Sequence, residues 1–153
     1  MFELTSEASF DAAHFLTNYK GKCENLHGHR WRVVACVGTD TLVQSGTEQD
    51  MVMDFAAFKA ALRDCVASFD HTFIVERGSL AQSTLDALNM EGFKLTMVDF
   101  RTTAENFARF FADELISRGL SITRVDVYET PKNCATYYPQ RDKTHLCLGP
   151  RLK

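Results

Sequence analysis

The sequence lacks the features that would place it in several large classes of protein. None of its apolar runs is long enough to cross a bilayer as a helix, so we expect no membrane partner. The first residues, Met1 to Leu4, show neither the basic segment nor the apolar core of a signal peptide, which predicts a cytoplasmic protein. Internal repeats and low-complexity linkers are also missing, so a repeat architecture is not expected.

An excess of positive charge is absent too. The chain carries 17 Lys and Arg against 20 Asp and Glu, for a net charge of −3 at pH 7, so we expect no nucleic-acid partner. With 153 residues, of which 45% are hydrophobic, the chain is long enough to bury one sizeable core. We therefore predict a single domain spanning residues 1–153.

The cysteines do not form a pattern typical of disulfides. There are five of them, an odd number at wide spacing, namely Cys23, Cys36, Cys65, Cys134 and Cys147. Cys36 and Cys65 lie in apolar stretches and are predicted to be small core residues. Only Cys23 is close to candidate metal ligands.

What is present is a concentration of histidine near the N-terminus. His27 and His29 are two residues apart, so in a β-strand their side chains leave the same face. His14 ends another strand-like run, and if the two runs are neighbours, three neutral imidazoles can hold Zn²⁺ and leave its fourth position open. Cys23 either completes a closed structural site as a fourth ligand or is a reactive group beside an open one. Iron or nickel are also compatible with three imidazoles.

The hydrophobic periodicity predicts an α+β domain. We expect strands over residues 2–10 and 31–39, a helix over 55–69 with Asp54 as its N-cap, a second helix that starts in the capping box Thr102–Glu105 and ends at Gly119, and strands over 121–130 and 134–138. The resulting order, ββααββ, is an antiparallel sheet with two helices on one face. Residues 76–97 form a predicted insertion, within which residues 76–94 are either a loop or a short extra helix. Residues 139–153 form a predicted irregular tail. Exposed edge strands favour oligomerisation.

Two further sites carry side chains suited to chemistry. Asp70-His71 follows the first helix, where the imidazole either complements the helix dipole or is tuned by the carboxylate for proton transfer. Glu129 ends a predicted strand. It is either solvated or, if buried, suited to bidentate binding of a guanidine-like heterocycle.

Taken in order, the motifs resemble one family over residues 2–138. They are Phe10-Asp11-Ala12-Ala13-His14, Cys23-x-x-x-His27-Gly28-His29, Met53-Asp54-Phe55, Phe69-Asp70-His71, Thr103-Ala104-Glu105-Asn106 and Tyr128-Glu129-Thr130. This ordered set resembles the 6-pyruvoyl-tetrahydropterin synthase and 6-carboxytetrahydropterin synthase family. The resemblance implies a tunnelling fold whose subunits join their sheets into a β-barrel, in a trimer-based homo-oligomer such as a hexamer, with active sites between subunits.

The resemblance also implies a set of roles for particular residues. It implies zinc on His14, His27 and His29, Cys23 as the catalytic base, Asp70 and His71 as a proton relay, and Glu129 as the pterin anchor, helped by Thr103 and Ala104. The implied substrate is 7,8-dihydroneopterin triphosphate. Lys20, Lys22, Arg30 and Arg32 either meet its triphosphate or are solvated surface charge.

The spacing between Cys23 and His27 bears on which member of the family the chain resembles. A three-residue gap is similar to that of bacterial 6-carboxytetrahydropterin synthases of 7-deazaguanine (queuosine precursor) synthesis, whereas pyruvoyl synthases carry a longer gap. The chain departs from the family pattern at Phe15, at Arg30-Trp31 and at Thr102. Two alternatives stay open: a 6-pyruvoyl-tetrahydropterin synthase, and a non-catalytic zinc- or pterin-binding module.

Overall fold

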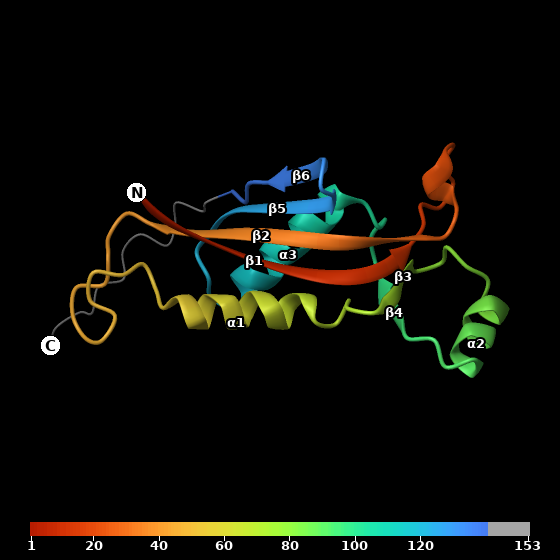
Figure 1. The fold of residues 1–153 in the computed structure, drawn as a ribbon, viewed down its shortest axis with the longest axis horizontal. Coiled ribbons are helices and arrows are strands. Elements are labelled where there is room, and N and C mark those ends of the chain that lie inside the picture. The colour runs from red at the N-terminus through yellow and green to blue at the C-terminus, as the bar shows by residue number, and fades with distance from the viewer. Residues whose placement is uncertain (141–153) are drawn as a thin grey trace, which may run out of the picture.

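The fold is built on one long antiparallel hairpin. In the computed structural model, which describes residues 1–140, strands β1 (Phe2–His14) and β2 (His27–Thr39) pair along their whole length. Along β1 the even-numbered side chains turn inward, and opposite them stand the odd-numbered side chains of β2, so Phe10 is paired with Trp31. Figure 1 shows these two long strands spanning most of the molecule, side by side.

Four shorter strands complete a six-stranded sheet in the order β4-β3-β1-β2-β5-β6. Strands β5 (Ile122–Thr130) and β6 (Asn133–Tyr137) extend it antiparallel on one side. On the other side β3 (Thr72–Glu76) runs parallel to β1, and β4 (Leu95–Val98) runs parallel to β3.

Two amphipathic helices pack on one face of this sheet. Helix α1 (Phe55–Val66) is capped by Asp54, whose carboxylate accepts from the amide of Ala57 at 2.9 Å, as expected. Helix α3 (Ala104–Ser117) has Arg118 as its C-cap, and Gly119 follows in the left-handed conformation (φ 86°) that glycine tolerates. Their apolar sides join the inward-facing residues of β1, β2 and β5 in one core. No helix among residues 1–140 is long and apolar enough to cross a membrane.

The α+β class and the two core helices are as predicted, and three details differ. The sheet is mixed rather than purely antiparallel, because β3 and β4 were missed: strands of five and four residues carry too few side chains for a clear period. Residues 76–94 contain a third helix, α2 (Gln82–Met90), which confirms the helical alternative; it buries no residue and lies at one end of the molecule (Figure 1). Helix α1 ends at Val66, short of residue 69, and the N-cap of α3 is Thr103, not Thr102. The expected tail lies almost wholly outside the described residues.

Candidate functional site

The three predicted histidines meet at one end of the long hairpin. The register places His14 opposite His27 and Ala12 opposite His29, so all three imidazoles leave the helix-covered face of the sheet. One nitrogen of each lies within 4.8 Å of those of the other two, close enough to share a metal ion. Neither Cys23 nor Glu129 is a member of this group, so among the described residues the imidazoles alone form the cluster.

Hydrogen bonds to backbone carbonyls fix two of the rings. Nδ1 of His14 lies 2.9 Å from the carbonyl oxygen of Thr102, and Nδ1 of His27 lies 2.7 Å from that of Asn25. Because a carbonyl oxygen only accepts, Nδ1 carries the proton and a neutral ring presents its Nε2 lone pair. Nε2 of each of the three histidines has no hydrogen-bond partner within residues 1–140. This arrangement of outer partners and free Nε2 atoms fits a metal site.

Burial keeps the cluster in the neutral form that a metal requires. The side chain of His14 is fully buried, and this burial, with smaller contributions from the neighbouring His27 and His29, lowers its pKa from 6.5 to about 4. Burial also lowers the pKa of His29, although the nearby Glu129 carboxylate opposes that shift. At neutral pH, a metal ion therefore has no proton to displace from His14.

An aromatic platform supports the cluster from the core side. The Trp31 ring is fully buried, with its centroid 5.0 Å from that of His14 and 5.5 Å from that of His29. Phe10 stacks on Trp31 at 6.0 Å, and Phe107 of α3 packs against it at 4.9 Å. Because these rings belong to the main core, the packing of the fold sets the position of the imidazoles.

A pocket of about 310 Å³ brings together most of the other predicted site residues. Cys23, Thr103, Ala104 and Glu129 all line it. Cys23 lies in the short 3₁₀ turn η1 (Lys22–Glu24), and its carbonyl accepts from the amide of Leu16 at 2.8 Å, which holds the turn against the end of β1. The Cys23 thiol, the Glu129 carboxylate and the first residues of α3 therefore face the same pocket.

His71, beside Asp70, lines a different cavity. His71 is exposed, in the left-handed conformation (φ 54°), and its Nδ1 lies 2.9 Å from the Asp70 carboxylate. The amide of Asp11 donates to Asp70 at 2.9 Å, and the amide of His71 donates to the carbonyl of Asp11 at 2.7 Å. These hydrogen bonds, the amide of Asp11 first and then His71, lower the pKa of Asp70. The structure therefore supports the interpretation of a carboxylate that orients an imidazole.

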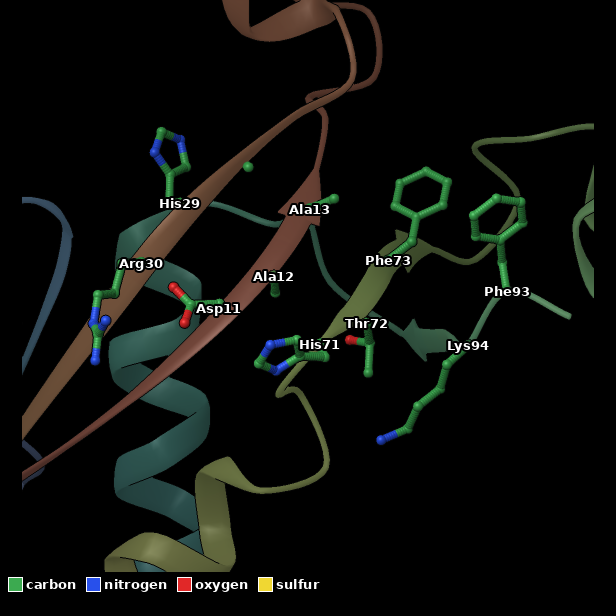
Figure 2. Close-up of a pocket in the computed structure, with 11 residues that line it drawn as sticks. Asp11, Ala12, Ala13, His29, Arg30, His71, Thr72, Phe73, Phe93 and Lys94 are labelled. Carbon is green, nitrogen blue, oxygen red and sulfur yellow. The ribbon is translucent and has the colours of Figure 1, made fainter.

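This second cavity has a volume of about 470 Å³ and includes Phe73 and Lys94 among its lining residues. His29 also contributes to its wall, but Figure 2 shows the His29 ring pointing away from His71. Cys23 and Glu129 do not line this cavity. Within one chain, the structure does not place the proposed relay in the pocket that holds Cys23.

The four basic residues considered for phosphate binding lie in different environments. Arg32 is already engaged: its guanidinium pairs with Glu7 at 3.0 Å and lies 3.8 Å from the centre of the Tyr128 ring. Arg30 lines the same cavity as His71. Lys20 and Lys22 are exposed.

Sequence reasoning missed three contributors and was right about the core cysteines. Thr102, expected as a helix cap, is instead the buried partner of His14, and Tyr19 and Cys134 line the pocket with Cys23. No local pattern marks these roles, because each depends on contacts between distant segments. Cys65 is buried as predicted, which raises the pKa of its thiol to about 11 and makes it unreactive.

Comparison with known proteins places this geometry in a family. The family model described as 6-pyruvoyl tetrahydropterin synthase matches residues 3–140. The chain is 40% identical over 120 residues to the 6-carboxy-5,6,7,8-tetrahydropterin synthase of Haemophilus influenzae, covering 75% of this chain and 82% of that one. It is 34% identical over 125 residues to the protein of the same name from Synechocystis sp., covering 75% and 97%. The solved structure of 6-pyruvoyl tetrahydropterin synthase from Plasmodium vivax superposes with a TM-score of 0.66 at 22% identity, covering 90% and 97%.

The fold is that of the tunnelling-fold class, as predicted, and it carries a histidine cluster that could hold a metal ion. The chain belongs to the 6-pyruvoyl tetrahydropterin synthase family. The curated relatives also confirm the predicted enzyme type, a lyase of the 6-carboxytetrahydropterin synthase kind.

Proposed function

We propose that the protein converts 7,8-dihydroneopterin triphosphate to 6-carboxy-5,6,7,8-tetrahydropterin, releasing acetaldehyde and triphosphate, in the synthesis of 7-deazaguanine (queuosine) precursors in the cytoplasm. The observation that carries this proposal is the pairing of three free Nε2 atoms with an adjacent pocket that holds Cys23 and Glu129. The names of the curated relatives support the carboxy product over the pyruvoyl product.

His14, His27 and His29 would hold the Zn²⁺ ion. Bound zinc supplies Lewis-acid polarisation of the substrate's side-chain oxygens. The Glu129 carboxylate can accept two N–H groups from the guanidine-like edge of a pterin, which would orient the ring in the pocket. Thr103 and Ala104 line the same pocket and would contact the ring from the start of α3. Cys23 would act as the base that removes a proton from the side chain.

Asp70 and His71 require a second copy of the chain in this proposal. His71 is exposed and lines a cavity that Cys23 does not share, so one chain does not assemble the full set. A trimer-based homo-oligomer that joins its sheets edge to edge would bring His71 of one copy to the pocket of the next. Asp70 would hold the imidazole in position, and His71 would exchange a proton with the substrate on the side away from Cys23.

A product assay tests the reaction. Zinc-loaded protein is incubated with 7,8-dihydroneopterin triphosphate, and the products are identified by mass spectrometry. We expect 6-carboxy-5,6,7,8-tetrahydropterin with acetaldehyde, and its rate should fall about 10²- to 10⁴-fold in a Cys23→Ala variant that keeps its metal. Cys65→Ala is the matched control, because that buried thiol lies in the core.

Each other outcome assigns the chain to an alternative. A 6-pyruvoyl product would identify the sister activity, which shares the same catalytic groups and gives the family model its description. Absence of turnover in metal-loaded, folded protein would contradict both activities and favour a non-catalytic binding module.

A further inference from the structure

A carboxylate oxygen faces the histidine cluster at a distance that a hydrogen bond does not explain. Oε1 of Glu129 lies 3.5 Å from Nε2 of His14 and 3.6 Å from Nε2 of His29. Hydrogen bonds between nitrogen and oxygen normally span about 2.7–3.2 Å, so neither contact is one. The Glu129 side chain is only 23% exposed, so this oxygen is held near the cluster rather than in bulk water.

The contact with His14 brings two electron-rich atoms together. Nδ1 of His14 donates to the carbonyl of Thr102, so Nε2 of the neutral ring points a lone pair at the carboxylate oxygen. Two facing acceptors repel one another unless a cation lies between them. A metal ion that accepts both lone pairs turns this repulsion into two bonds.

The distances from Glu129 to two of the three imidazoles match that arrangement. Two ligand atoms on a tetrahedral zinc ion, each at about 2.0–2.1 Å, are separated by about 3.3 Å. The observed separations of 3.5 and 3.6 Å from the two imidazoles are close to this value. Glu129 reaches the site from the end of β5, which pairs with β2 next to the histidines.

The geometry points to Glu129 as the fourth ligand of the metal ion when no pterin is bound. This inference rests on the proposed metal site and goes beyond it, because it gives one carboxylate two successive partners. Glu129 also lines the pocket that holds Cys23, so the N–H groups of an entering pterin would compete with the metal for the same oxygens. Binding of the ring would release Glu129 from the metal and open the coordination position only when substrate is present.

Cobalt substitution tests this inference without measuring turnover. The visible absorption of protein-bound Co²⁺ depends on the number and type of its ligands. We expect Glu129→Gln to change this spectrum and to weaken Zn²⁺ binding, measured by competition with a chelator, by at least about tenfold. Glu129→Ala should have the same effect, which guards against misfolding of either variant, and circular dichroism checks the fold. Glu105→Gln is the matched control, since Glu105 lines the same pocket but is not one of the carboxylates near the imidazoles.

A pterin without a side chain provides the second arm. Added to wild-type Co²⁺-protein, it should shift the spectrum toward that of Glu129→Gln and should leave the spectrum of the variant unchanged. An unchanged affinity and spectrum in both Glu129 variants, with metal still bound, would overturn the inference and leave the proposed function intact. A wild-type protein that binds no divalent metal would overturn the inference together with the proposed metal site.

Discussion

Two polar corners lie near the same end of β1: the histidine corner, formed by His14, His27 and His29, and the Asp70-His71 corner, which hydrogen-bonds to the backbone of Asp11. In the histidine corner, His14 is fully buried, held by the carbonyl of Thr102 and supported by Trp31. In the Asp70-His71 corner, the imidazole is exposed and its residue has a positive φ. The first corner completes its own constellation within one chain, whereas the second presents its groups outward.

Although His71 is exposed, hydrogen bonds fix its backbone conformation. A non-glycine residue at positive φ costs of the order of 1–3 kcal/mol and persists only where its surroundings fix it. For His71, the surroundings are its amide bond to Asp11 and its contact with Asp70, which itself accepts from Asp11. A strained, oriented imidazole at the surface is what a site completed by a neighbouring copy would need.

The largest effect should come from removing a metal ligand. His27→Ala is expected to weaken Zn²⁺ binding by more than about 100-fold, beyond what loss of an outer hydrogen-bond partner costs, and to abolish turnover. His71→Ala is the matched comparison, because it removes the same side chain from the exposed corner. It should keep its metal while losing activity. Mass spectrometry gives the metal content of each variant, and chelator competition gives its affinity for Zn²⁺. Equal loss of metal in the two variants would show that His27 is no more a metal ligand than His71.

The next effect tests whether the two corners meet across copies. Cys23→Ala and His71→Ala should each lower turnover by about 10²- to 10⁴-fold. If each site takes its thiol from one copy and its imidazole from a neighbour, co-assembly of the two variants in equal amounts should restore about one quarter of the wild-type rate.

A second mixture controls for this recovery. His71→Ala mixed with Asp70→Asn carries both changes on the same contributing side, so no site regains a full set and no activity should return. If the Cys23 and His71 variants also fail to complement after verified subunit exchange, the thiol and the imidazole belong to one chain.

The same comparison shows what could be predicted from the sequence. The histidine corner was predictable because its ligands are local: His27 and His29 obey the two-residue period of a strand, and His14 ends the adjoining strand. The residues that hold these histidines in place were not predictable, because Thr102, which bonds to His14, lies 88 residues away in the sequence. The sheet edge was also missed, since β3 and β4 are short and join the sheet by parallel pairing, which depends on contacts distant in sequence.

The Asp70-His71 corner was predictable as a motif but not as a geometry. The dipeptide alone favours a dipole-complementing histidine over a tuned imidazole. The positive φ of His71 and the hydrogen bonds through Asp11 add a geometry that suits an oriented imidazole, and both depend on the position of β1. Its roles in proton transfer and in a neighbouring site stay predictions.

The smallest effect concerns how the free energy of unfolding of the metal-free protein depends on pH, because His14 and Asp70 contribute in different pH ranges. The pKa of His14 is about 4 in the folded protein and 6.5 as its ordinary value. Between these values the unfolded chain binds more protons, so the free energy of unfolding should rise with pH from 4 to 6.5, by at most about 3 kcal/mol, and then level off. His29, whose pKa is also lowered, adds in the same direction. Asp70 acts in a separate window: its lowered pKa means that its contribution is lost only as pH falls below its ordinary value of 3.8.

Denaturant titrations across this range, on wild type and on His14→Gln, measure the difference. A glutamine can still donate to the carbonyl of Thr102 but does not titrate, so the rise between pH 4 and 6.5 should become shallower in the variant. Asp70→Asn should leave this rise unchanged, since it removes a charge only from the exposed corner. If the free energy of unfolding rises equally with pH in wild type and in His14→Gln, the buried His14 ring is not the group that couples folding to protonation. Burial of His14 would then not distinguish the histidine corner from the exposed one electrostatically.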